Sequence, residues 1–348
     1  MAKNIVIFSD GTGQERGKTF DSNIVKLLNL SINDAAKGQI TAYDAGLGAE
    51  GRKLVQMSTG FGIKKNIYDC YEAIVRNYQP GDRLFFFGFS RGAYTVRALA
   101  GWMKYVGILP EWGDECLRNE AWKVYQIKDQ EKRIQAGEDF RKYHGCHEAD
   151  IEFMGVFDTV KALGLPLGLD FINPYQHKFF DHSLSGNVKR GYHAISLDDN
   201  RLTFHPEVWD EKKENKDQVI EQVWFAGVHS DIGGSYEHRG LGDITLTWML
   251  HHAKEAGLLI DDRADVPFSY EVNPNGHLHN SQKGWSMIYR NRTRLWSFPK
   301  LVPQVYQSVV DRDLSQSNRR SAYRPWIVKK HETITVPYVP GVKPVKPD

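Results

Sequence analysis

The sequence predicts an α/β fold in which a mostly parallel sheet is flanked by helices. Continuous apolar runs at residues 4–8 and 84–87 are typical of strands covered on both faces. Segments with helical spacing of apolar residues alternate with strands over the first hundred residues, an order that predicts right-handed β-α-β crossovers. The composition, 41% hydrophobic and 25% charged, is that of an ordinary globular chain.

Each element has a local signal. Short apolar runs rich in β-branched and aromatic residues predict strands. Capping residues, and apolar residues three and four positions apart, predict helices. In chain order we expect a strand at 4–8, a helix capped by Asp21 or Ser22, a strand at 40–43, a helix at 61–78, a strand at 84–87, a helix at 93–103, strands at 151–157 and 219–226, and a helix at 241–256.

One domain over residues 1–348 is the simplest organisation, because there is no internal repeat, low-complexity tract or clear linker. Insertions are expected at about 104–149 and 161–190, and a loosely held, proline-rich tail at 336–348. The insertions contain many aromatic residues and leucines. They either cap a site as an apolar lid or bury core around an extended sheet, and both interpretations stay open.

Charge and cysteine content limit the class of protein. A net charge of +2 gives no electrostatic reason to expect a nucleic-acid partner. The three cysteines, Cys70, Cys116 and Cys146, do not form a disulfide framework and fit a reducing compartment. The N-terminal apolar run is too short for a signal peptide. We expect synthesis in the cytoplasm, and export without a cleavable signal stays open.

The motif with the clearest chemistry is Gly-Phe-Ser-Arg-Gly at residues 88–92. Ser90 lies between a buried strand and a helix, where a sharp turn presents a nucleophilic serine and requires glycine two residues to either side. This context predicts an α/β-hydrolase-like fold with Ser90 as the nucleophile. The alternative is a glycine-rich packing turn.

The loop after the first strand, Asp10-Gly11-Thr12-Gly13, lies two strands upstream of the Ser90 strand. In a hydrolase fold this position supplies an oxyanion donor, so we assign one backbone donor to Gly11 or Thr12 and the other to Arg91. A plain turn is one alternative, and a phosphate-cradling or metal-binding loop around Asp10 is another. A Walker loop is excluded because Gly-Lys-Ser/Thr is missing.

Two later strands end in the other candidate catalytic residues. Asp158 follows the strand at 151–157, and a buried carboxylate there needs a partner. His229 follows the strand at 219–226 and could take the Ser90 proton. The order Ser, Asp, His matches this fold class. Asp158 could instead cap the following turn.

Rivals remain for each role. Asp231 is an alternative orienter of the histidine, and His193 and His205 are alternative bases. His144-Gly145-Cys146-His147 resembles a metal motif but lies in a polar insertion. His251 and His252 lie in the middle of a helix and are interpreted as structural or exposed. We therefore predict no metal and no cofactor.

Several segments together resemble the family of uncharacterised α/β-hydrolase domains that includes phospholipase effectors of bacterial type VI secretion. They occur in the family's order from residue 5 to about residue 236. Residues 308–309 and 323–325 show a weaker similarity to the end of the family's sequences. The similar segments are 8–12, 88–94, 155–160, 198–201 with Phe204 and Pro206, and 227–236.

The resemblance implies an ester hydrolase, with lipids as substrates in the best-described branch and with Ser90, Asp158 and His229 as the catalytic residues. Two positions depart from the family pattern. Asn200 stands where an acidic residue is expected, and Tyr306 where relatives often have a histidine. If some relatives take their base from the tail, this chain cannot.

We expect a serine hydrolase that cleaves a carboxylic ester, of a phospholipid or another lipid, through an acyl-enzyme on Ser90. The alternatives are a cytoplasmic esterase or thioesterase for small soluble substrates, and a non-catalytic binding protein on a hydrolase fold. Expected partners are the lipid or small ester, a membrane surface contacted peripherally, and an immunity or secretion-system protein; nucleic acid is not expected.

Overall fold

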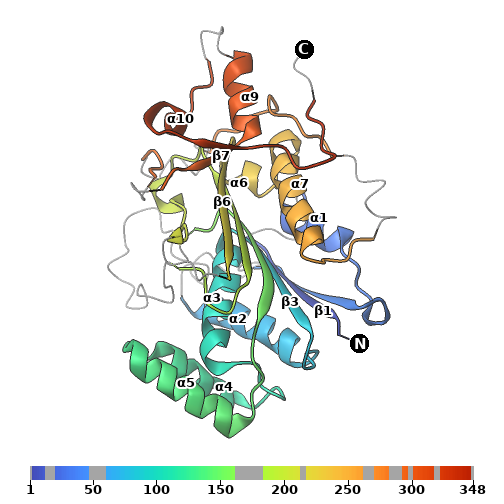
Figure 1. The fold of residues 1–348 in the computed structure, drawn as a ribbon, viewed down its shortest axis with the longest axis vertical. Coiled ribbons are helices and arrows are strands. Elements are labelled where there is room, and N and C mark those ends of the chain that lie inside the picture. The colour runs from blue at the N-terminus through green and yellow to red at the C-terminus, as the bar shows by residue number, and fades with distance from the viewer. Residues whose placement is uncertain are drawn as a thin grey trace.

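The computed structural model describes residues 2–11, 20–46, 60–160, 183–211, 217–261, 270–281, 292–296, 301–316 and 322–345. At its centre lies a sheet of eight strands in the order β2-β1-β3-β4-β5-β6-β7-β8. Every neighbouring pair in this sheet is parallel. Helices lie on both sides of the sheet (Figure 1). The predicted fold class, a parallel α/β-hydrolase-like sheet flanked by helices, is confirmed.

The element bounds agree closely with those expected for the first half of the chain. The strands are β1 (Asn4–Ser9), β2 (Gln39–Asp44), β3 (Arg83–Phe89), β4 (Ile151–Phe157), β5 (Arg190–Ser196), β6 (Val219–Phe225), β7 (Gln304–Tyr306) and β8 (Ile334–Val336). The α-helices are α1 (Asn23–Leu30), α2 (Gly60–Val75), α3 (Arg91–Val106), α4 (Glu115–Gln126), α5 (Gln130–His144), α6 (His229–Ile232), α7 (Gly240–Glu255), α9 (Gln307–Gln316) and α10 (Trp326–Lys330).

The continuous apolar run of β1 is explained by the two layers around it. Ile5 and Ile7 face the core that contains α2 and α3. Val6 and Phe8 point the other way, into the core that contains α1 and α7. Successive strand residues point to opposite faces, so a strand covered on both faces must be apolar at every position.

The strand order reverses beside β1. The chain passes from β1 to β2 on one side and then returns across β1 to β3 on the other. A reversal of this kind opens a crevice at the carboxyl ends of the two central strands, where open α/β sheets bind ligands. The residues that follow β1 and β3 are Asp10-Gly11 and Ser90.

The first insertion, expected at about 104–149, folds into α4 and α5. Its large side chains Trp122, Tyr125 and Phe140 are buried in the core shared with α3, and the Trp102 indole donates to the Ala121 carbonyl. These contacts lie at the C-terminal turns of α3, a helix of 16 residues and roughly 24 Å in length. The insertion therefore packs at the opposite end of α3 from Ser90, as in the core-burying interpretation (Figure 1).

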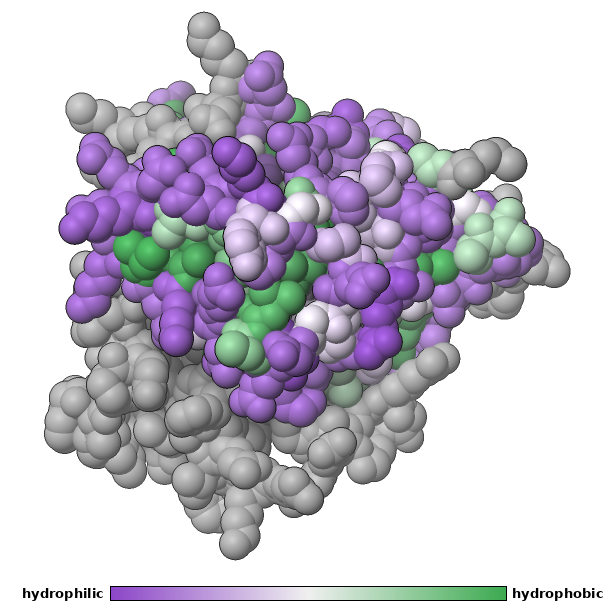
Figure 2. Space-filling model, turned by 90° about the horizontal axis from the view of Figure 1, so that it is seen from below, coloured by the Kyte–Doolittle hydropathy of each residue, from purple (hydrophilic) through white to green (hydrophobic). Residues whose placement is uncertain are grey.

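Figure 2 views the molecule from the end where α4 and α5 lie. The coloured surface is largely hydrophilic, with hydrophobic residues gathered in a strip near its middle. The second insertion was expected at 161–190, and its part at 161–182 lies outside the described residues. No helix in the described part of the chain is long and apolar enough to cross a membrane.

Three strands and several helices were not predicted. β5 has the sequence RGYHAIS, in which charged and polar residues interrupt the apolar run. β7 and β8 have three residues each, too few for a periodic signal. β7 is stabilised by neighbours distant in sequence, because its Val305 shares a core with Trp224 and Ile327. β8 is held by its pairing with β7.

Candidate active site

Ser90 occupies a strained turn between β3 and α3. Its φ of 57° is one of two positive values among the described non-glycine residues, and the other belongs to Asp158 (40°). A Cβ on Gly92 would lie 2.1 Å from the Ser9 carbonyl oxygen, and one on Gly88 would lie 2.5 Å from the Cα of Ala93. Both glycines of the motif are therefore required by close backbone contacts, and strain of this kind clusters at functional sites.

A chain of hydrogen bonds connects Ser90, His229 and Asp158. The His229 Nε2 atom lies 2.8 Å from the Ser90 Oγ atom, and Nδ1 lies 2.6 Å from the Asp158 Oδ2 atom. The exposed fractions are 7% for Ser90, 4% for His229 and 0% for Asp158. The three residues, singled out far apart in the sequence, thus meet at the carboxyl edge of the sheet in the geometry of a nucleophile, a base and an orienting acid.

Asp158 is held from several sides. Its Oδ1 atom accepts from the Ser196 backbone N–H (2.9 Å), and Arg294 donates through Nη1 to Oδ1 (2.6 Å) and through Nη2 to Oδ2 (2.9 Å). Burial alone would raise the pKa of Asp158, but Arg294 and His229 lower it below its usual value. The carboxylate is therefore ionised at neutral pH.

Arg294 is a site residue that the sequence analysis missed. Its side chain is completely buried, and Nη1 also donates to the Ser196 carbonyl (2.7 Å). It lies in a polar stretch after α7 with no apolar periodicity, so no local pattern marks it. A physical argument could still have predicted such a residue. A buried, charged carboxylate at position 158 needs an opposite charge or several hydrogen-bond donors, and a single neutral imidazole is not enough.

His229 is enclosed by aromatic rings. Its imidazole centroid lies 4.8 Å from that of Phe89 and 5.0 Å from that of Phe204. The His229 backbone N–H donates to Asp199 (3.2 Å), which is paired with Arg201. Burial lowers the pKa of His229, and the bond to Asp158 only partly opposes this effect. The imidazole is therefore neutral near pH 7 and able to accept a proton.

Two of the proposed oxyanion residues, Arg91 and Gly11, lie beside Ser90. Arg91 is the first residue of α3, so its backbone N–H lies at the positive end of the helix dipole. A Cβ on Gly11 would lie 3.4 Å from the Cβ of Ser90, which places the β1 loop against the serine. The Gly11 N–H donates to the Asp10 carboxylate (2.7 Å). Thr12 lies outside the described residues.

Asp10 anchors the start of this loop. Its carboxylate also accepts from the Ser22 hydroxyl (2.6 Å) and the Tyr43 hydroxyl (3.1 Å). Burial raises the pKa of Asp10 to about 6. These bonds tie the β1 loop to α1 and β2.

The rival residues have other partners. Asp231 Oδ1 lies 2.6 Å from the His279 Nδ1 atom, and its Oδ2 accepts from the Val228 N–H. His193 is fully buried in β5, where Nε2 accepts from the Thr159 N–H (3.1 Å), and burial lowers its pKa to about 3. Nε2 of His205 lies 3.1 Å from the Arg292 carbonyl oxygen. These contacts support neighbouring loops.

Potential metal ligands gather away from Ser90. Within the described ranges, one group of three brings its ligand atoms within 4.8 Å of one another: His251, His252 and Glu255. In the His144-Gly145-Cys146-His147 segment, His144 lies 3.5 Å from Glu120, and His147 pairs through its backbone with Ile108.

The parallel sheet, the strained serine turn and the hydrogen-bonded Ser-His-Asp arrangement define the α/β-hydrolase class of proteins. The family model of the type VI secretion phospholipase effector Tle1-like catalytic domain matches residues 3–252. The chain belongs to this family, and membership supports a hydrolase.

Similar proteins come from yeast and bacteria. An uncharacterized protein of Saccharomyces cerevisiae is 30% identical over 227 residues, which are 58% of this chain and 32% of that protein. The chain thus spans about a third of the length of this curated relative. An uncharacterized protein from Pseudomonas aeruginosa has 20% identity and a TM-score of 0.45, covering 78% of this chain and 49% of that one. The Tle1 effector bound to the VgrG spike of the type 6 secretion system has 21% identity and a TM-score of 0.39, covering 68% and 52%.

Proposed function

We propose that this chain is a serine hydrolase domain that cleaves carboxylic esters of phospholipids through an acyl-enzyme on Ser90. The observation that carries the proposal is the bond of 2.8 Å from Ser90 Oγ to His229 Nε2, continued by the bond of 2.6 Å from Nδ1 to Asp158. A serine hydroxyl becomes nucleophilic when a positioned base takes its proton.

In the acylation step, His229 Nε2 takes the Ser90 proton while Oγ attacks the ester carbonyl. The Arg91 N–H stabilises the oxyanion. We assign the second donor to the backbone of Thr12 rather than Gly11, because the Gly11 N–H is already donated to the Asp10 carboxylate. His229, now an imidazolium stabilised by Asp158, gives the proton to the departing alcohol oxygen. The products are the free alcohol and an acyl group on Ser90.

Deacylation repeats these roles with water. His229 takes a proton from the water as its oxygen attacks the acyl carbon, and the proton then returns to Ser90 as the fatty acid leaves. The full cycle consumes one water and uses no cofactor.

A phospholipid substrate is supported by the family description, which names phospholipase effectors. The rings of Phe89 and Phe204 pack against His229, so the surroundings of the base are apolar, which is compatible with an acyl chain. Small soluble esters are the alternative substrate class.

A fluorophosphonate probe tests the mechanism. We expect stoichiometric labelling of the wild type, loss of labelling in Ser90→Ala and His229→Ala, and retained labelling in the control His205→Ala. A folded wild-type protein that takes up no label would refute the serine mechanism. Labelling that survives in His229→Ala but disappears in the control would reassign the base to His205.

A second experiment tests the substrate. Nitrophenyl esters of increasing chain length and phospholipid vesicles are compared at equal protein concentration. We expect turnover to rise with chain length and fatty acid to be released from vesicles. Activity that peaks at acetate and is absent on vesicles would replace the lipid proposal with a small-ester esterase.

Partners are proposed on family grounds alone. The Tle1 effector is described bound to a VgrG spike, and we propose a secretion-system component or an immunity protein as the partner of this chain. Affinity purification of the tagged protein from its native cells should recover such a protein, and recovery of neither would count against this role.

A further inference from the structure

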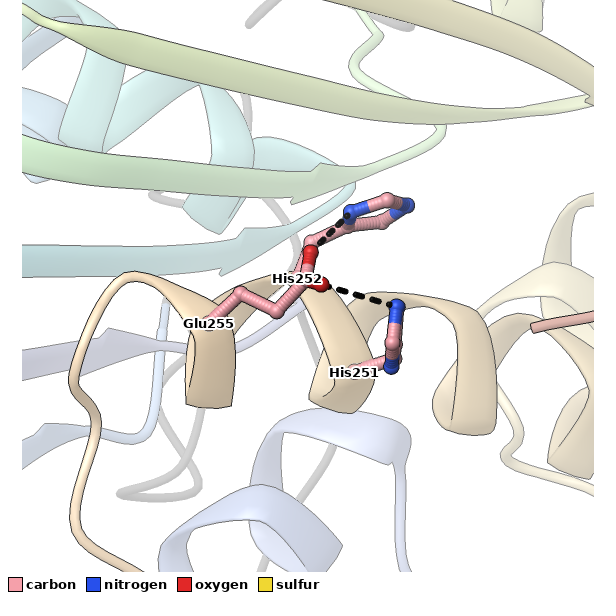
Figure 3. Close-up of side chains that lie close together, drawn as sticks. All are labelled: His251, His252 and Glu255. Atoms are coloured by element: carbon pink, nitrogen blue, oxygen red, sulfur yellow. Dashed lines mark ion pairs between the residues drawn. The ribbon is translucent and has the colours of Figure 1, made fainter. Parts of the chain in front are cut away.

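The last turn of α7 gathers two imidazoles around one carboxylate (Figure 3). The His251 Nε2 atom lies 3.4 Å from Glu255 Oε1, and the His252 Nδ1 atom lies 3.6 Å from Glu255 Oε2. The spacings are i,i+4 and i,i+3, which bring side chains of one helix together. This cluster lies outside the proposed catalytic site and has no part in its chemistry.

The distances fit a shared cation better than direct hydrogen bonds. Both exceed the usual 2.7–3.2 Å for a bond from nitrogen to oxygen. Ligand atoms about 2.0–2.1 Å from a tetrahedral metal ion lie roughly 3.3 Å from one another. His252 Nδ1 is also buried and has no hydrogen-bond partner among the described residues, so a buried lone pair is available to a ligand.

The His252 ring is held in place before any ion binds. It stacks on Tyr192 of β5, with centroids 4.3 Å apart and planes inclined by 16°, and it packs edge-on against Trp248 at 5.3 Å. A ligand whose ring is already fixed loses little side-chain entropy on binding. Only His251 and the exposed Glu255 need to adjust.

The local charge also favours a cation. The C-terminus of α7 carries the negative end of the helix dipole. Glu221 of β6 brings a second carboxylate close enough for its charge to interact with that of Glu255. A divalent ion in this position would offset the repulsion between the two carboxylates.

We propose that His251, His252 and Glu255 form a binding site for a divalent transition-metal ion of the zinc class. Two imidazoles and one carboxylate suit Zn²⁺, Co²⁺ or Ni²⁺ rather than Mg²⁺ or Ca²⁺, and water completes the coordination. The ion has a structural role: it fixes the last turn of α7 above β5 and β6. His251 and His252 are thus more than the structural or exposed histidines that the sequence indicated.

Titration of the chelator-treated full chain with Zn²⁺ and with Co²⁺ tests the site. We expect one ion per chain, a visible Co²⁺ absorption band and a rise in the thermal midpoint with Zn²⁺. His252→Phe keeps the ring that stacks on Tyr192 but removes the nitrogen, and Glu255→Gln keeps the shape but removes the charge. Each should weaken Zn²⁺ binding by at least about tenfold, the lower bound found even for outer-shell ligand partners.

His144→Gln is the matched control, because His144 also lies beside a glutamate, at 3.5 Å. It should bind Zn²⁺ like the wild type. Circular dichroism of each variant confirms that it is folded. Absence of saturable binding would overturn the proposal, as would binding unchanged by both site variants or lost in the control.

Discussion

Asp158 accepts bonds from a backbone N–H, from an imidazole and from both Nη atoms of Arg294. This number of donors fixes the carboxylate orientation and keeps it ionised. The Oδ2 atom accepts hydrogen bonds from both His229 and Arg294. The negative charge that would stabilise an imidazolium is therefore partly compensated by the guanidinium, which helps to keep His229 neutral in the resting site.

Arg294→Met tests the anchoring of Asp158. Removal of one partner from a buried ion pair leaves the other charge uncompensated, and we expect the free energy of unfolding to fall by about 3–5 kcal/mol. Urea unfolding at neutral pH measures it. Arg76→Met is the control, because Arg76 pairs with Glu72 on the surface of the protein and its loss should cost under about 1 kcal/mol.

The same variant has a characteristic pH dependence. The folded-state pKa of Asp158 is depressed, so this group stabilises the fold above its unfolded pKa of about 3.9, and the stability is lost as the pH falls toward the folded value. Arg294→Met should bring the folded-state pKa of Asp158 closer to its unfolded value. The difference in stability between wild type and variant should shrink in acid, and a difference that grows below about pH 4 would contradict the assignment.

The pH profile of Ser90 labelling reports on His229. Only the neutral imidazole is a base, and burial lowers its pKa, so the acid limb of the labelling rate should have its midpoint below about 6.5. Arg201 contributes to the lowering, while the adjacent Asp199 opposes it. Arg201→Gln should therefore move the midpoint to higher pH, and a move to lower pH would show that another group controls the limb.

The turn between β3 and α3 requires glycine at position 92, because the backbone of β1 lies very close to it. In Gly92→Ala the new Cβ would meet the Ser9 carbonyl oxygen at 2.1 Å, and neither backbone segment can move without displacing Ser90. We expect a stability loss of about 1–3 kcal/mol and a labelling rate reduced at least about tenfold, since small misplacements of a nucleophile are costly.

Gly81→Ala provides the comparison. Gly81 has a φ of +96°, and no atom lies within 4 Å of the position that an alanine Cβ would take there, so the change costs about 1–2 kcal/mol of backbone strain. We expect similar losses of stability in the two variants, but normal labelling in Gly81→Ala. Equal labelling in both would mean that the turn between β3 and α3 tolerates the added methyl group.

The sequence predicted well those elements whose pattern is local. β1, β3, β4 and α7 have long periodic or continuous apolar runs, and their expected bounds differ from the observed ones by at most one or two residues. β5 was missed because one of its residues, His193, is a buried histidine whose polarity is satisfied by Thr159 and Gln222. Such compensation exists only in three dimensions, so the pattern of the strand alone could not reveal it.

The candidate site extends beyond the part of the chain that the family model matches. The match ends at residue 252, yet β7, β8 and Arg294 follow it. The positions of Ser90, Asp158 and His229 could be predicted because each follows a recognisable strand. Arg294 could not, since its place beside Asp158 results from the return of the chain after α7.

A chain that ends at residue 291 tests this dependence. It retains the whole matched region but lacks Arg294, β7 and β8. We expect no fluorophosphonate labelling and a lower helix signal in circular dichroism, while a chain ending at residue 345 should behave like the full one. Normal labelling of the shorter chain would show that the matched region is sufficient.

The bond between Arg294 and Asp158 also has a consequence for the newly made protein. The two residues are 136 positions apart, and chains are synthesised at about 5–20 residues per second. Ser90, Asp158 and His229 therefore all leave the ribosome before the residue that holds the acid in place, by an interval on the order of ten seconds for Asp158. The site cannot be complete until the C-terminal part of the chain has been made. During most of its synthesis, the growing chain therefore has an incomplete catalytic site.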